Sequence, residues 1–385
     1  MGKMICVGGD MLRKRTKIIV AILSILMLIA VSALGAFIGI KVQRKNQQNT
    51  MDFSSLVSSA NKTVLFIGDG MGENHIKVAS AFYEKEMFMT SFEKKGFVST
   101  FSNSLVSPTD SAAAASALAT GQKFDNKEVS RHNGIDVETI SEIAKKTGIG
   151  VGIVTTDSLD GATPSCFSSH ANRRGDSDEI IKGQIESQID LFLGAGKNTY
   201  DNFQSEIEAK GFAYSSNLND FSFAQRRVFG SFENVVSKDG TNLTPTLEML
   251  TEFAIDFFET NFPNGYFLMI EGAHIDKKSH ANQIFEMIEY LNSFDQSIKL
   301  AHDKLSGQNG VAIIVTADHE TGGLQFNNQT KEQISNSLYT RTGHSSKDVP
   351  YFIFFKPSKN VDLSALKSQI DNTDIFKLCK SFISK

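Results

Sequence analysis

The segment Val311-Ala-Ile-Ile-Val-Thr-Ala-Asp-His319 indicates the fold, because an apolar run without charge ends directly in an acidic residue and a histidine. Apolar residues that do not alternate with polar ones are typical of a strand buried on both faces of a parallel sheet. Similar runs occur at residues 63–67, 149–155, 190–194, 266–270 and 351–355. Helical patterns lie between these runs. The sequence therefore predicts an α/β fold with three layers, α/β/α, around a central, mostly parallel sheet.

Two helical patterns and one irregular region complete this outline. Thr244-Pro245 is typical of a helix start, with a capping residue followed by proline at the first helical position. Periodic apolar residues follow it on one face, and a second helix is predicted from about Ala281 to Leu305. Residues 212–240 show no such period, so we expect an irregular insertion over the sheet there.

The composition argues against a nucleic-acid partner and against a cysteine-based metal or redox site. Lys plus Arg is 39 and Asp plus Glu is 43, a net charge of −4, so there is no basic excess to favour nucleic acid as a partner. The three cysteines, Cys6, Cys166 and Cys379, have spacings that fit no zinc or redox motif. Any metal site must therefore use histidines and carboxylates, which are ligands that suit zinc and magnesium.

Residues 18–40 are apolar and carry no charged side chain, so as a helix they can cross a hydrocarbon layer of about 30 Å. More Lys and Arg residues precede this segment than follow it, which predicts a cytoplasmic N-terminus. We expect a cytoplasmic segment at residues 1–17 and a transmembrane signal-anchor at residues 18–40. A polar tether at residues 41–61 and a globular domain at residues 62–385 would follow. The alternative is a signal peptide that is cleaved after a small-residue site such as Ala33-Leu34-Gly35, which would release a secreted protein.

Carboxylates follow the predicted strands at three places. Asp69 comes just after the first strand, Glu271 ends the 266–270 strand, and Asp318 follows the 311–316 strand. Since chemistry in such sheets gathers at the carboxyl ends of the strands, we expect these groups at one edge. Three buried carboxylates would repel one another there, and at least one would have to bind a proton. A cluster of divalent cations removes this conflict.

Other ligand candidates are close to these carboxylates in the sequence. Asp276 and His280 are four residues apart and would share one helix face, where they can bind one metal. His319 is adjacent to Asp318, and His344 offers an imidazole in a loop. Taken singly, Asp276 and His280 would also fit a solvated helix face. Taken together, the groups are hard to explain without metals.

Ser111 is the candidate nucleophile. It lies in Ser107-Pro-Thr-Asp-Ser111-Ala-Ala-Ala-Ala-Ser116, where small residues allow a helix to pack closely behind it. The free N–H groups and dipole of a helix N-terminus favour a bound phosphate. By itself, the segment fits an ordinary buried, alanine-rich helix with a Ser/Asp cap better than a nucleophile.

In combination these motifs resemble those of the alkaline phosphatase family. The resemblance runs in family order from about residue 63 to 345. It is carried by the segments Ile67-Gly-Asp69-Gly-Met-Gly72, Thr109-Asp110-Ser111-Ala-Ala, Gly161-Ala-Thr163-Pro164, His170-Ala-Asn-Arg-Arg174, Glu271 through His280, Thr316-Ala-Asp318-His319 and Thr342-Gly-His344. It implies that residues 62–385 form an alkaline phosphatase-like catalytic domain.

The resemblance also implies the roles of the site residues. It assigns two zinc ions, one to Asp276, His280 and His344 and one to Asp69, Asp318 and His319, and one magnesium ion to Asp69, Thr163 and Glu271. Ser111 would attack the phosphorus of a small phosphate monoester and form a phosphoserine, which water then hydrolyses. Arg174 would bind two phosphate oxygens, with Arg173 as its adjacent rival. A homodimer is a further expectation.

Two other functions stay open. One is a phosphodiesterase of the same superfamily, whose metal ligands overlap with these. The other is a membrane-anchored phosphate-binding protein that has lost catalysis.

The sequence departs from the family pattern beside the magnesium motif. Gly161 occupies a position where many members have Asp or His, and we expect this glycine to leave room for water and to weaken magnesium binding. On that view Gly161→Asp should tighten magnesium. Asp110 and Lys277 are expected to support the site from behind its ligands, and His274 has no assigned role.

Overall fold

The computed structural model describes residues 15, 17–20, 22–29, 51–104, 108–364 and 366–384, which divide into two units at residues 50 and 51. In the first unit the described residues are helical. No helix among the described residues is both long enough and apolar enough to cross a membrane. Residues 21 and 30–40 of the predicted span lie outside the described residues. The anchor and the segment boundaries around it stay predictions.

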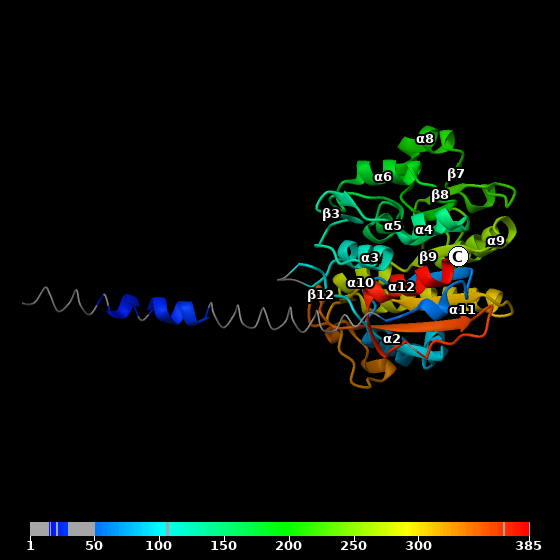
Figure 1. Cartoon of the computed structure of the whole chain (residues 1–385). Coiled ribbons are helices and arrows are strands. Elements are labelled where there is room, and N and C mark those ends of the chain that lie inside the picture. Colours follow the sequence, from blue (N-terminus) through cyan, green and yellow to red (C-terminus); the bar gives the residue numbers. More distant parts are fainter. Residues whose placement is uncertain are drawn as a thin grey trace, which may run out of the picture. The chain divides into compact units, whose positions relative to one another are not determined.

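The second unit is built on one large sheet (Figure 1). In spatial order its strands are β14 (Gln369–Asp371), β2 (Lys94–Ser99), β13 (Val349–Lys356), β10 (Val311–Thr316), β1 (Lys62–Ile67), β9 (Tyr266–Glu271), β5 (Gly150–Ser158), β6 (Leu191–Ala195), β8 (Val228–Phe232) and β7 (Ala213–Ser215). β13 runs antiparallel to both of its neighbours, and the other pairs are parallel. This confirms the mixed α/β fold and the mostly parallel sheet.

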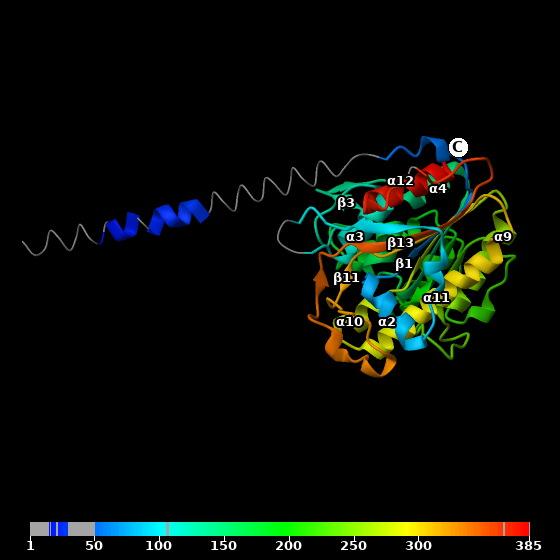
Figure 2. The same cartoon turned by 90° about the horizontal axis from the view of Figure 1, so that it is seen from below.

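Helices cover both faces of the sheet (Figure 2). One face carries α3 (Ser111–Thr120), α4 (Ile140–Thr147) and α12 (Asn372–Ile383), and the other carries α2 (Glu73–Tyr83), α9 (Leu247–Asn261), α10 (His274–His280) and α11 (Ile284–Leu305). Helix α5 (Ala162–Ser168) packs against α3 and α4. Helices α6 (Ser177–Glu186), α7 (Lys197–Tyr200) and α8 (Gln204–Ala209) lie along the chain between β5 and β7. Strands β9 and β10 are buried from end to end and β1 is buried after Lys62, as the apolar runs predict.

Two details of the predicted outline are wrong. Helix α9 is capped by Thr246, whose hydroxyl accepts from the N–H of Met249 at 3.3 Å, so Thr244-Pro245 precedes the helix. The helix predicted from about Ala281 to Leu305 is confirmed as α11, which begins at Ile284 and is separate from α10. Residues 212–240 are not an insertion over the sheet, because they supply the edge strands β7 and β8.

The register of the central strands brings their carboxyl ends to one level. Ile67 of β1 is opposite both Glu271 of β9 and Thr316 of β10, and Thr155 of β5 is also opposite Glu271. The residues that follow these strands therefore meet at one edge of the sheet, as predicted for Asp69, Glu271 and Asp318.

Candidate active site

Asp69, Asp318 and His319 converge at this edge. Nε2 of His319 is 3.2 Å from Oδ2 of Asp318 and 3.6 Å from Oδ1 of Asp69. Those two carboxylate oxygens are buried and accept no hydrogen bond from any described residue. Buried acceptors without donors are costly, and a divalent cation satisfies several of them at once. The three side chains therefore fit a metal ion.

Gly70 makes this convergence possible. Its φ of 74° lies in the left-handed region, which favours glycine, and its N–H donates to Oδ1 of Asp318 at 3.0 Å. A Cβ on Gly70 would lie 2.8 Å from Cα of Asp276. The glycine after Asp69 therefore serves both the turn and the close approach of helix α10.

The protonation of these groups reflects their burial. Burial, followed by the negative charges of Asp318, Asp276 and Glu271, raises the pKa of Asp69 well above its usual range. Burial also raises the pKa of Asp318 to about 7. The pKa of His319 is lowered well below its usual value, first by burial and then by His344 and His280. The protein alone thus favours neutral side chains here, whereas a bound cation favours the carboxylates.

Asp276, His280 and His344 form a second group. Nε2 of His280 lies 3.3 Å from Oδ2 of Asp276 and 3.1 Å from Nε2 of His344, which in turn lies 3.7 Å from Oδ1 of Asp276. The other ring nitrogen of His344 donates to the carbonyl of Thr109 at 2.8 Å, and that of His280 donates to the carbonyl of Thr342. In the neutral rings this leaves both Nε2 atoms as acceptors that face each other. A cation bound between the two rings would accept a lone pair from each Nε2 atom.

Thr321 links the two groups, and sequence reasoning missed it. Its hydroxyl donates to Oδ1 of Asp276 at 2.5 Å and lies 3.2 Å from Nδ1 of His319. The register of the small β11–β12 sheet (Glu320–Thr321 and His344–Ser345) sets Thr321 opposite His344. A threonine two residues after a ligand carries no sequence signal of its own, so only the folded arrangement identifies it.

Glu271 and Thr163 form a third group beside the first. Glu271 accepts a hydrogen bond from the hydroxyl of Thr155, and Oγ1 of Thr163 is buried without a partner among the described residues. Burial, followed by the negative charge of Asp157, raises the pKa of Glu271 to about 8. Asp69 is close enough to Glu271 for the two charges to interact. These oxygens fit a hard cation such as Mg²⁺, which prefers oxygen ligands.

Ser111 lies at the N-terminus of α3, beside the first metal-fitting group. It is the first residue of that helix and 4% exposed, and its Oγ is 3.2 Å from Nε2 of His319. Asp110 caps the helix by accepting from the N–H of Ala113 at 3.0 Å. The hydroxyl is therefore held next to both the helix N-terminus and the first group of ligands.

Of the two neighbouring arginines, the structure brings only Arg174 to this site. Nη1 of Arg174 is 3.4 Å from Oδ2 of Asp110, and its charge acts on Asp69. Both arginines are exposed, and Arg173 contacts Asp176 through its backbone N–H, at 3.1 Å. The Asp110 carboxylate thus contacts both the N–H of Ala113, in the first turn of α3, and the guanidinium of Arg174.

The space expected beside Gly161 is not open. A Cβ on this glycine would lie 2.9 Å from Oδ2 of Asp157 and 2.8 Å from the carbonyl of Ser158. Lys277 forms an ion pair with Asp157. The prediction that Gly161 leaves room for water is therefore wrong, because Asp157 fills that side of the site. His274 stacks on Tyr290 at 4.5 Å between ring centroids.

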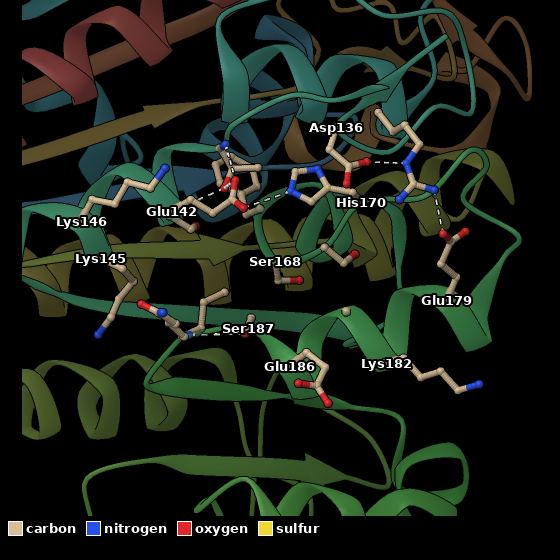
Figure 3. A pocket seen from close by; sticks show the side chains of 18 residues that line it. Asp136, Glu142, Lys145, Lys146, Ser168, His170, Glu179, Lys182, Glu186 and Ser187 are labelled. Carbon is tan, nitrogen blue, oxygen red and sulfur yellow. Dashed lines mark hydrogen bonds and ion pairs between the residues drawn. The ribbon is translucent and has the colours of Figure 1, made fainter. Parts of the chain in front are cut away.

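A separate pocket of about 590 Å³ lies between α4 and α6 (Figure 3). His170 lines it, with Nδ1 donating to the carbonyl of Ser130 at 2.7 Å and Nε2 3.3 Å from Glu142. Burial alone would lower the pKa of His170, but these hydrogen bonds raise it. The charged lining is largely paired within the protein, through Arg131 with Asp136 and Glu179, Lys145 with Asp190, and Lys146 with Glu138. None of the predicted metal ligands lines this pocket, so it is the weaker candidate.

The sequence and the structure are similar to those of known alkaline phosphatases. The family model described as alkaline phosphatase matches residues 60–377. Alkaline phosphatase 3 and alkaline phosphatase 4 of Bacillus subtilis are 30% and 29% identical to the chain, over 80% and 78% of it and 71% and 70% of their own lengths. The structure of alkaline phosphatase from the Antarctic bacterium TAB5 matches with a TM-score of 0.72 and 27% identity, covering 84% of this chain and 98% of that one. A mutant of that enzyme with Mg bound in the M3 site matches with a TM-score of 0.71 and 26% identity, covering 86% and 99%.

Proposed function

The chain belongs to the alkaline phosphatase family and is a phosphoric monoester hydrolase, and we propose that it acts through a phosphoserine at Ser111. The observation that carries this proposal is the position of the Ser111 hydroxyl, 3.2 Å from His319 and at the N-terminus of a buried helix. Attack by this oxygen on phosphorus would transfer the phosphoryl group to Ser111 and expel an alcohol. Water would then release inorganic phosphate.

The family uses metal ions, and the donors described above fit them. We assign one zinc ion to Asp276, His280 and His344, a second to Asp69, Asp318 and His319, and magnesium to Asp69, Thr163 and Glu271. When bound, these ions supply Lewis-acid stabilisation of the nucleophile, the leaving group and the phosphoryl oxygens. The unpartnered oxygens of Asp69, Asp318 and Thr163 are the main support for this assignment.

The protein's own groups bind and orient the ester. Arg174 would release Asp110 and present its planar fork to two phosphoryl oxygens, since a dianionic phosphate is a stronger partner than a contact at 3.4 Å. The N–H groups of the first turn of α3 would stabilise the same charge. The carbonyls of Thr109 and Thr342 hold the rings of His344 and His280 with Nε2 directed at the site.

One experiment separates this function from the two alternatives. The full-length protein in detergent is assayed with p-nitrophenyl phosphate and with bis-p-nitrophenyl phosphate, before and after chelation and after zinc and magnesium are restored. We expect preferential monoester hydrolysis that chelation abolishes and the metals restore. Faster diester turnover would favour a phosphodiesterase, and phosphate binding without turnover would favour an inactive binding protein.

A homodimer stays a prediction. We further propose that residues 18–40 hold the catalytic unit on the outer side of a membrane. The charge-free apolar run and the excess of Lys and Arg before it support this location. Protease added to intact cells should digest the catalytic unit. Full protection, with activity in the cytosol, would contradict the proposal, whereas a released form that starts near Ala36 would indicate cleavage.

A further inference from the structure

Asp157 occupies the place that a side chain at residue 161 would fill. Gly161 has a φ of −57°, which any residue adopts, so the glycine is not required by its backbone conformation. What a larger residue would meet is the carboxylate of Asp157, whose Oδ2 is 2.9 Å from the position of a Cβ. The Asp157 carboxylate can therefore lie where it does because residue 161 has no side chain.

The Asp157 carboxylate is held at one oxygen. Its Oδ1 accepts from the N–H of Ser158 at 2.7 Å and pairs with Nζ of Lys277. Its own backbone N–H donates to Oγ1 of Thr155 at 2.9 Å, and that hydroxyl donates to Glu271. A continuous chain of hydrogen bonds thus connects Asp157 to the predicted magnesium ligand Glu271.

The other oxygen of Asp157 has no such partner. Oδ2 forms no hydrogen bond with any described residue, although the carboxylate is only 24% exposed. Among neighbouring charges, that of Asp157 acts most strongly on Glu271. Thr163 presents a further oxygen to the same place, since its buried Oγ1 lies close to Glu271.

We propose that Asp157 is an oxygen donor of the magnesium site, acting with Asp69, Thr163 and Glu271 and replacing the side chain that Gly161 lacks. Magnesium is bound by carboxylates and keeps several waters, so a carboxylate at this position can reach the ion directly or through one of its waters. Lys277 orients the carboxylate through Oδ1 and leaves Oδ2 for the ion. This inference rests on the proposed function, because it assumes that the third group binds magnesium.

The test measures magnesium binding and not turnover. Magnesium is titrated by calorimetry into the zinc-loaded, full-length protein in detergent. Asp157→Asn should weaken magnesium binding by about 10–100-fold while zinc content stays at the wild-type level. Gly161→Ala should weaken it as well, because the added methyl group displaces Oδ2, and Gly161→Asp should weaken rather than tighten it.

Asp160→Asn is the matched control. Asp160 lies on the same loop, but its carboxylate accepts from the Ser158 hydroxyl, and we assign it no part in the site. Wild-type magnesium affinity in Asp157→Asn would overturn the proposal, and so would equal losses in Asp157→Asn and Asp160→Asn. If the wild type binds magnesium tightly but forms no phosphoserine, the proposed function fails while the role of Asp157 stands.

Discussion

Oγ of Ser111 lies 3.2 Å from Nε2 of His319, although the two residues are 208 positions apart in the sequence. The contact exists because helix α3 begins at Ser111 and strand β10 ends at Thr316, at the edge where the central strands terminate. The same edge holds the unpartnered oxygens of Asp69 and Asp318. Nucleophile and metal-fitting groups are thus brought together by the topology of the sheet.

Removing the metals should make the stability of the protein fall as pH rises. The pKa values of Asp318 and Glu271 are raised to about 7 and about 8, above those of unfolded carboxyls, so the folded state binds the extra protons. Buried neutral histidines such as His319 act in the opposite sense, but only up to their unfolded pKa of about 6.5. Between pH of about 6.5 and about 8 the carboxyls should therefore dominate.

The measurement is the melting temperature of chelated and metal-loaded protein across this pH range. We expect the chelated protein to lose stability as pH rises and the metal-loaded protein to keep it, because bound cations favour the ionised carboxylates. A chelated protein whose melting temperature rises across the range would contradict the description of these groups as buried and close together.

Thr321→Val should weaken zinc binding while it preserves shape and burial. The hydroxyl donates to Asp276 and lies against Nδ1 of His319, so its loss leaves both ligands less well oriented. We expect zinc affinity to fall by about 10–100-fold, as measured by competition with a chromogenic chelator. Thr63→Val is the control, because Thr63 is equally buried but its hydroxyl has no partner among the described residues. Unchanged zinc affinity in Thr321→Val would show that the contact orients neither ligand.

Arg174→Lys should weaken inhibition by inorganic phosphate by about tenfold or more, because a lysine cannot make the two parallel hydrogen bonds of a guanidinium. Arg173→Lys is the matched control, since Arg173 is adjacent to Arg174 and both are exposed. Inhibition constants for phosphate in both variants and the wild type provide the measurement. A larger effect at Arg173 would reverse the assignment.

The sequence predicts the core of this fold well, because a strand buried on both faces must be apolar along its whole length. That pattern reveals burial but not direction, so it does not show that β13 runs antiparallel to its neighbours. It also misses β2, whose residues alternate between partly buried and exposed over most of its length. The start of α9 was misplaced because two threonines flank Pro245, and only the hydrogen bond to Met249 identifies Thr246 as the cap.

The candidate site likewise has features that the sequence predicts and features that it does not. Side chains that carry chemistry, such as Asp69 and His344, are visible in the sequence as ligand types at strand ends and loops. The backbone carbonyls of Thr109 and Thr342 that orient the histidines leave no trace in residue type. Asp157 was overlooked for a related reason, because its approach to Gly161 depends on the turn after β5 and not on any spacing.

The most direct test of the account is the chemical identity of the residue that carries phosphate during turnover. The full-length protein is incubated with a phosphate monoester, quenched in acid, digested and analysed by mass spectrometry, with Ser111→Ala in parallel. We predict a phosphoserine at Ser111 in the wild type, and in Ser111→Ala no phosphopeptide, a turnover reduced by orders of magnitude and retained phosphate binding. A phosphopeptide that persists in Ser111→Ala, or wild-type turnover without Ser111, would contradict the account.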